Sequence, residues 1–248
     1  MFGRVKINYM YLGKKVLAVV PARSGSKGIK DKNMKILGGL SLIARAAKCL
    51  NELDWIDLKI LSTDSNRYAD EGKKYGLQVP FLRPNFLSSD NATAIDTMIH
   101  ALQESEKIFN IEFDILLIIE PTSPFRISSD IEGACKELIE NNADSVVCVS
   151  LLDTKHHPAK VLTVQSGRLQ HYEQRGKDIT VRQQLENLYA RNGICYAINK
   201  NCLLSNKGVI TDKTRAFLVD RHIVNIDEPI DIKWAEFLIQ SDFVKLTT

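Results

Sequence analysis

A strand that runs directly into a basic, glycine-containing loop is the feature that most restricts how this chain can fold. Residues 16–20 are apolar and rich in valine, and a proline follows them, which predicts a strand buried on both faces. The loop at residues 21–33 carries four basic residues against a single acid, Asp31, while Gly25 and Gly28 let backbone N–H groups approach an anion. The pattern favours a phosphate-binding loop, and a solvated turn is the alternative that the loop alone leaves open.

Apolar strand-like segments alternate with amphipathic helix-like segments along the rest of the chain. Such alternation predicts right-handed crossovers and a mostly parallel sheet in a three-layer α/β/α domain over residues 15–248. The predicted strands cover residues 58–63, 79–82, 115–119, 145–150, 194–198 and 217–227. The predicted helices start near residues 41, 65, 92, 128 and 228, and in the last one Ile230, Trp234, Phe237 and Leu238 should face inward.

Two segments fall outside the alternating pattern. Residues 1–14 hold no apolar core of the signal-peptide kind and are expected to form an N-terminal extension. Residues 153–189 lack a clear apolar face. They contain a turn-forming sequence, Gln165-Ser-Gly-Arg168, which predicts a hairpin. We expect this second segment to be a small insertion that leaves the sheet and acts as a dimer arm.

Composition limits the classes of partner. The 33 basic and 30 acidic residues give a net charge of only +3, which does not favour nucleic acid. No apolar run approaches the roughly 20 residues that cross a bilayer, so no membrane partner is expected. The five cysteines form no C-x-x-C pair, and reduced core thiols predict a cytoplasmic protein.

Polar clusters follow the predicted strands at the points where those strands end. In an open α/β sheet such clusters meet in one crevice beyond the carboxyl ends of the strands, where ligands bind. The loop at 21–33 is neither a Walker P-loop nor a dinucleotide fingerprint, because the required glycine and lysine spacings are absent. The clusters lie at residues 21–33, 62–64, 83–91, 120–126 and 225–231.

A series of short motifs resembles the acylneuraminate cytidylyltransferases, with their relatives that activate legionaminic, pseudaminic and Kdo-type acids. The resemblance covers residues 15–243, nearly the whole chain. In chain order the motifs are Pro21-Ala-Arg-Ser-Gly-Ser-Lys-Gly28, Lys32-Asn33, Ser62-Thr-Asp64, Leu82-Arg-Pro84, Ser89-Asp90, Pro121-Thr-Ser-Pro-Phe-Arg126, His156-His-Pro158, Arg182-Gln-Gln184, Asn192-Gly193 and Ile226-Asp227.

The resemblance implies a reaction and a homodimer. CTP and an acidic 2-keto sugar would give a CMP-sugar and pyrophosphate, with catalysis resting on positioning and charge neutralisation. Arg23, Lys27 and Lys32 resemble the catalytic cations of that family, and Arg83 with residues 90–94 resembles the part that receives cytosine. The CTP-binding residues implied in this way are Ala22, Arg23, Ser26, Lys27, Lys32, Asn33, Arg83, Ala92 and Ala94.

The acceptor-sugar site is implied at the exit of the strand at 115–119. Arg126 is there a candidate partner for the sugar carboxylate. The sialic acid enzymes usually carry glutamine where this chain has Glu120, and a carboxylate would disfavour a second carboxylate and prefer a sugar amide or amine. Legionaminic acid or another nonulosonic acid is therefore an alternative to N-acetylneuraminate. The implied sugar-binding residues are Glu120, Pro121, Thr122, Ser123, Arg126, Lys160, Arg182, Gln184 and Asn192, some of them reaching a partner subunit.

The metal site departs from the family pattern. Similar enzymes present Asp-x-Asp to Mg²⁺, whereas this chain has Asn225-Ile-Asp227. Mg²⁺ keeps several waters and needs one or two carboxylates, so Asp227 with Asn225 can suffice, and Asp231 is a substitute ligand. Three alternative interpretations stay open. In one, Asp227 only caps the last helix. In the other two, the whole chain is a Kdo-type synthetase or an inactive sugar-nucleotide-binding module.

Overall fold

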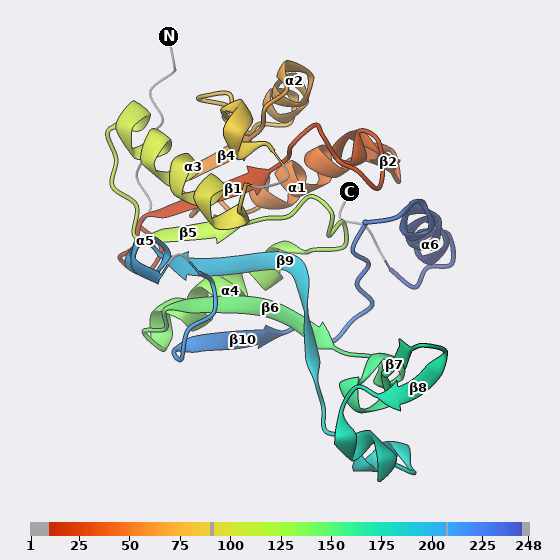
Figure 1. Ribbon diagram of the computed structural model, residues 1–248. Coiled ribbons are helices and arrows are strands. Elements are labelled where there is room, and N and C mark those ends of the chain that lie inside the picture. The colour runs from red at the N-terminus through yellow and green to blue at the C-terminus, as the bar shows by residue number, and fades with distance from the viewer. Residues whose placement is uncertain (1–9, 90–91, 207, 245–248) are drawn as a thin grey trace.

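The computed structural model describes residues 10–89, 92–206 and 208–244. Within these residues the core is a six-stranded sheet with the order β10-β6-β9-β5-β1-β4 (Figure 1). Strand β1 is parallel to β4 and β5, and β10 is parallel to β6, whereas β9 runs antiparallel to both of its neighbours. The predicted mostly parallel sheet is confirmed. The strands are β1 Val16–Pro21, β4 Leu58–Ser62, β5 Ile115–Ile118, β6 Ser145–Leu151, β9 Tyr189–Asn199 and β10 Thr214–Leu218.

Helices cover both faces of the sheet, as the three-layer prediction requires. Alternate residues of β1 enter two different cores: Val16, Ala18 and Val20 pack with α1 and α4, and Leu17 and Val19 pack with α3 and α5. This period of two arises because successive strand side chains point to opposite faces. The helices are α1 Leu42–Asn51, α2 Asn66–Lys74, α3 Ala94–Phe109, α4 Ser128–Glu140, α5 Lys200–Asn206 and α6 Pro229–Gln240.

Side-chain caps fix where the helices begin. The Ser41 hydroxyl accepts a hydrogen bond from the Ala44 N–H at 3.0 Å, so α1 begins where the sequence predicts. Helix α4 starts with Ser128 inside the helix and Ile127 at the cap, because the Asp130 carboxylate accepts from the Ile127 N–H at 3.0 Å. The serines at this helix start, Ser128 and Ser129, suggest a hydroxyl cap from sequence, and that prediction is wrong.

Two predicted strands differ from the structure. Residues 79–82 form no strand, and the chain beside β4 pairs only through an isolated bridge between Ile60 and Gln78. Prolines at positions 80 and 84 lack the N–H groups that a ladder needs. The last strand covers Thr214–Leu218 rather than 217–227, because the following residues leave the sheet and the Ile226 N–H donates instead to the Thr122 carbonyl at 2.8 Å.

Helix α6 presents its aromatic face outward. Ala235 and Leu238 are buried, but Ile230, Trp234 and Phe237 are 62%, 50% and 48% exposed. Three of the four residues predicted to face inward are therefore wrongly placed. The helix buries the other side against a small cluster beneath the loop at 21–33, which holds Ile29, Leu37, Leu42, Phe125, Val224 and Ile226.

Residues 152–188 lie outside the six-stranded sheet, between the ends of β6 and β9 (Figure 1). They contain the predicted hairpin, in which β7 Leu162–Gln165 pairs antiparallel with β8 Arg168–His171. Val164 and Leu169 on this hairpin are 68% and 66% exposed. The other short elements of the fold are β2 Ile36–Leu37, β3 Leu40–Ser41, η1 Lys32–Met34, η2 Asn85–Leu87, η3 Thr154–His156, η4 Pro158–Lys160, η5 Gln174–Lys177 and η6 Arg182–Gln184.

None of the described helices combines the length and the apolar character that spanning a membrane requires.

Candidate active site

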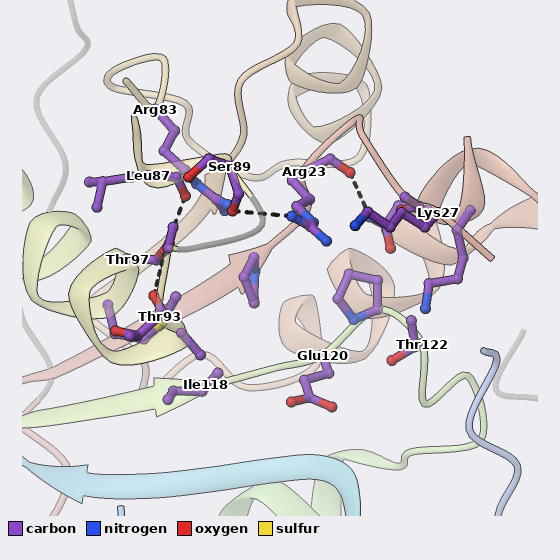
Figure 2. A pocket seen from close by; sticks show the side chains of 18 of the residues that line it. Arg23, Lys27, Arg83, Leu87, Ser89, Thr93, Thr97, Ile118, Glu120 and Thr122 are labelled. Carbon is purple, nitrogen blue, oxygen red and sulfur yellow. Dashed lines mark hydrogen bonds between the residues drawn. The ribbon is translucent and has the colours of Figure 1, made fainter. Parts of the chain in front are cut away.

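A cavity of about 510 Å³ lies beyond the carboxyl ends of β1 and β5. The basic loop and the segment that holds Arg83, Leu87, Ser89, Thr93 and Thr97 form its upper and left walls, and Glu120 and Thr122 lie opposite Arg23 and Lys27 (Figure 2). Lys27 and Asp227 line this same cavity although they are 200 positions apart in sequence. Its lining residues are Pro21, Arg23, Ser26, Lys27, Gly28, Lys32, Asn33, Arg83, Leu87, Ser89, Ala92, Thr93, Ala94, Thr97, Met98, Ile118, Glu120, Pro121, Thr122 and Asp227.

The basic loop is held from behind by bonds to α2 and to the end of β4. The Ser24 N–H donates to the Asp64 carboxylate at 2.8 Å, and the Ser24 hydroxyl donates to the same group at 3.0 Å. Asp31, in the left-handed region with φ 54°, accepts from the Tyr68 hydroxyl at 3.2 Å and from Arg67 at 3.0 Å. The Arg67 bond lowers the pKa of Asp31. These contacts leave the cationic side chains pointing at the cavity.

Gly28 brings the loop into direct contact with the segment before α6. A Cβ built at Gly28 would lie 2.7 Å from the Asp227 carbonyl oxygen, so only glycine allows this approach of the two backbones. The Asp227 side chain then meets Lys32, whose Nζ lies 2.9 Å from Asp227 Oδ1. The contact fixes an acidic group at the cationic end of the cavity.

A second wall is formed by residues within 83–89 and 92–97. Arg23 donates through Nη1 to the Ser89 carbonyl at 3.3 Å, which joins the basic loop to this wall (Figure 2). Arg83 is buried and donates to the Ser62 hydroxyl at 3.1 Å and the Ser62 carbonyl at 2.6 Å. Burial lowers the pKa of Arg83 to about 10. Ala92 and Ala94 also line the cavity, whereas Asp90 and Asn91 of the predicted segment lie outside the described residues.

The exit of β5 supplies a half-buried carboxylate. Burial and the nearby Glu120 carboxylate raise the pKa of Tyr196 on β9 to about 12, and a Cβ built at Gly193 would clash with Glu120 Oε2. Gly193 has a φ of +68°, a conformation that L side chains rarely adopt. Burial is the main cause that raises the pKa of Glu120, and the nearby Asp227 charge adds to it, while Arg126 lowers it.

Ser123 and Arg126 follow Glu120 in sequence but do not line the cavity. Arg126 is 3% exposed and donates to the carbonyls of Ile194 at 2.9 Å, Gly193 at 3.0 Å and Glu120. The Ser123 hydroxyl is buried and donates to the Asn192 carbonyl. The structure therefore uses these two side chains to join the β5 exit to β9, and the expected contact of Arg126 with a sugar carboxylate is not supported.

Several other predicted site residues also lie away from the cavity wall. Ala22 is fully buried beside β4, and Asn192 is buried with its amide donating to the Ser150 hydroxyl at 3.0 Å. Lys160 and Gln184 belong to the segment outside the sheet, where Gln184 accepts from the Thr180 and Val181 N–H groups. Arg182 lies in η6 of the same segment, and its side chain is outside the described part of the structure.

The donors near Asp227 decide whether Mg²⁺ fits. Asp231 accepts from the N–H groups of Asp227 at 2.8 Å and Glu228 at 2.7 Å, so it caps α6 rather than serving as a spare ligand. Asn225 accepts from the Ser123 hydroxyl at 3.2 Å. The described residues contain no group of three metal-ligating side chains. A single carboxylate suits Mg²⁺ that shares its other positions with phosphates and water, so Asp227 fits such an ion.

Comparisons with known proteins identify the architecture that carries this cavity. The family model described as Cytidylyltransferase matches residues 17–244. The chain belongs to the cytidylyltransferase family. The cytidylyltransferase is 31% identical over 227 residues to the post-translational flagellin modification protein B of Campylobacter coli, covering 91% of this chain and 95% of that one. It is 30% identical over 228 residues to the CMP-N,N'-diacetyllegionaminic acid synthase of Legionella pneumophila, covering 91% and 97%.

A solved structure of CMP:2-keto-3-deoxy-manno-octonic acid synthetase complexed with CTP resembles the cytidylyltransferase with a TM-score of 0.69. The match covers 92% of this chain and 99% of that one at 14% identity, which supports the shared α/β fold. The recognition of the family from its motifs is confirmed by these comparisons.

Sequence reasoning missed part of the cavity wall of the cytidylyltransferase. Thr97, Met98 and Ile118 line the cavity, although their spacing on α3 and β5 indicated core positions. Thr93 lies beside them as the cap of α3, with its hydroxyl accepting from the Asp96 N–H at 3.0 Å. The signal available in sequence was the threonine at a helix start, which indicates a cap but does not distinguish a solvent-facing end from one facing a ligand.

Proposed function

We propose that this cytidylyltransferase transfers CMP from CTP to a nonulosonic acid of the sialic acid type, releasing pyrophosphate. The observation that carries the proposal is the cavity itself, which places Arg23, Lys27 and Lys32 opposite a wall that begins at Glu120. The names of the relatives, including the legionaminic acid synthase, support CTP and an acidic sugar as the substrates. A CMP-pseudaminic or Kdo-type product is the alternative within the same chemistry.

The basic loop would hold the triphosphate. The anomeric hydroxyl oxygen attacks the α-phosphorus and gives up its proton to water, while the bond between that phosphorus and the bridging oxygen to the β-phosphate breaks. Lys27, Lys32 and Arg23 offset the negative charge that grows on the departing pyrophosphate, and the backbone N–H groups near Gly28 support the same oxygens. Ser26 and Asn33 contribute polar side chains to this wall, and Ala22 holds the strand end behind them.

Mg²⁺ is part of the proposal. Asp227 would hold the ion, and Asn225 would approach it only after exchanging its bond from Ser123. The bound ion supplies additional charge neutralisation on the triphosphate oxygens. Asp231 keeps the Asp227 backbone in place through the cap of α6, so its role is that of a positioning residue.

The two ends of the cavity suit the two remaining parts of the substrates. Arg83 and the backbone at Ala92 and Ala94 would receive the cytosine ring, which needs few donors and acceptors. Glu120, Pro121 and Thr122 would receive the acceptor sugar, where the Glu120 carboxylate accepts from an amide or amine N–H. A nonulosonic acid that carries such a substituent fits this end better than one that presents a carboxylate there.

Pyrophosphate release from CTP, measured with a panel of acceptor acids, tests the assignment. The panel would include N-acetylneuraminate, legionaminate, pseudaminate and Kdo. Lys27→Ala should reduce turnover by roughly 10²- to 10³-fold, as removal of one charge-stabilising donor does elsewhere, while the far-side control Lys136→Ala should not change it. Binding of CTP without turnover on any acceptor would instead support the inactive binding module.

We further propose that the protein is a cytoplasmic homodimer. All five cysteines are free and buried, as expected of a protein kept in a reducing compartment. Residues 152–188 would act as the dimer arm, because apolar side chains such as Val164, Leu169 and Tyr172 are exposed on it. The segment between β6 and β9 holds Lys160, Arg182 and Gln184, outside the six-stranded sheet that carries the cavity. These residues would therefore contact substrate in the cavity of a partner subunit.

A further inference from the structure

Lys32 and Asp227 form an ion pair at the cavity wall. The Nζ–Oδ1 distance is 2.9 Å, and the side chains are 18% and 67% exposed. The proposed function assigns Lys32 to the triphosphate and Asp227 to its metal ion. In this structure each is the partner of the other.

The backbones behind both side chains are held in position. Lys32 begins η1 directly after Asp31, which is anchored to α2 through the Tyr68 hydroxyl. On the other side, the Asp227 N–H donates to Asp231 at 2.8 Å, and the Asp227 carbonyl lies against Gly28. The ion pair can therefore open by rotation of the two side chains while both backbones stay in place.

The ammonium of Lys32 lies where a cation bound to Asp227 Oδ1 would have to approach. A divalent ion at the same oxygen would be repelled by an ammonium that stayed within about 3 Å of it. Metal binding at this oxygen is therefore weakened until the lysine moves away. Leaving is unfavourable unless another anion receives the ammonium, and the triphosphate oxygens are such an anion.

We propose that Lys32 serves as the resident counter-ion of Asp227 in the nucleotide-free enzyme and moves to the phosphates when the metal–nucleotide complex arrives. The metal then enters together with the nucleotide, and free divalent cations bind weakly to the empty cavity. The inference rests on the proposed function, since it assigns the metal to Asp227. It adds the order of the exchange, in which Lys32 leaves Asp227 for the phosphates as the nucleotide and the metal arrive together.

Titration of the nucleotide-free protein with Mn²⁺ tests the proposal, with free Mn²⁺ followed by electron paramagnetic resonance. Lys32→Met should bind Mn²⁺ roughly fivefold more tightly than the unchanged protein, because an ion pair of this kind contributes up to about a factor of five in affinity. Lys30→Met is the matched control, since it removes the same charge from an exposed position of the same loop. It should leave the affinity nearly unchanged.

Adding Asp227→Asn to Lys32→Met should remove the gain. An equal gain in Lys30→Met, a gain that survives Asp227→Asn, or no gain in a folded Lys32→Met protein would each overturn the proposal. Lys32→Gln serves as the second variant if the methionine protein does not fold, as judged by circular dichroism. Pyrophosphate release by the unchanged protein is measured separately, so that loss of the proposed function and loss of this exchange are told apart.

Discussion

Glu120 is a carboxylate held against two neighbours that restrict it. Burial and the nearby Glu120 charge raise the pKa of Tyr196 to about 12, and the absence of a side chain at Gly193 leaves room for Glu120 Oε2. The cost of placing an ionised group there appears as a pKa raised mainly by burial. This unfavourable free energy of ionisation arises at the end of the cavity that we assign to the sugar.

Glu120→Gln should therefore stabilise the folded protein, and more so at higher pH. Because the pKa of Glu120 is raised on folding, the native state binds more protons than the unfolded state between the ordinary pKa of glutamate and the raised value, so stability falls as pH rises through that window. The glutamine removes the penalty. Thermal unfolding should show a gain at pH 8 that shrinks toward pH 5.

Glu236→Gln is the control for this measurement, because Glu236 is exposed on α6. Its effect should be small at both pH values. A gain in Glu120→Gln that was the same at pH 5 and pH 8 would contradict the assigned cause of the shift.

Sequence patterns predicted which residues lie near the cavity better than they predicted the direction in which each side chain points. The position of Arg23, Lys27 and Lys32 at the cavity was predictable, because a basic, glycine-containing loop at the end of a buried strand lies at the edge of the sheet where cavities form. Arg126 was not, because an arginine at a strand exit has the same sequence pattern whether it faces a ligand or the backbone. The Gly193 and Ile194 carbonyls that it contacts belong to a strand 67 and 68 positions later.

At the scale of elements, Arg126 connects the exit of β5 to the bend of β9. Arg126→Met should lower the free energy of unfolding by about 3 kcal/mol, because it leaves buried carbonyls without donors. Arg215→Met, which removes an exposed pair with Glu137, should cost less than about 1 kcal/mol. Chemical denaturation measures both changes. A variant that kept its stability and lost only affinity for the sugar would restore Arg126 as a sugar contact.

The elements that sequence patterns misplaced share one physical cause. Helix α6 and residues 79–82 were interpreted from local apolar spacing, but their final environment depends on what covers them. Prolines prevent residues 79–82 from forming the hydrogen bonds of a strand. Helix α6 packs against a narrow cluster, in which Ala235 and Leu238 are its buried residues. By contrast, α1 and α2 begin at Ser41 and Ser65, because a capping hydroxyl acts within its own turn.

At the scale of the whole molecule, the alternation of strands and helices was enough to predict the layers but not the direction of β9. An apolar run has the same pattern in either direction, and β9 is antiparallel to β5 and β6. That reversal follows from the segment at 152–188, which carries the chain away from the sheet at the end of β6 and returns it from the same side (Figure 1).

The proposed homodimer makes a prediction at this scale. Replacing two exposed hairpin residues together, Val164→Asp with Leu169→Asp, should convert the dimer to a monomer, because charged groups would have to be buried in the interface. Light scattering after size-exclusion chromatography measures the mass. The matched control places aspartates at the exposed Ile36 and Ile210 instead. A protein that is monomeric before any substitution would refute the arm.

Strand β9 links distant regions through one continuous backbone. It starts at Tyr189, beside the excursion, and reaches the middle of the sheet, and on the way Gly193 touches the carboxylate of Glu120. The pairing register between β6 and β9 shifts near this point. Because the backbone runs without interruption from residues 152–188 into this strand, a contact made on the outer segment would be transmitted toward the end of the cavity at Glu120.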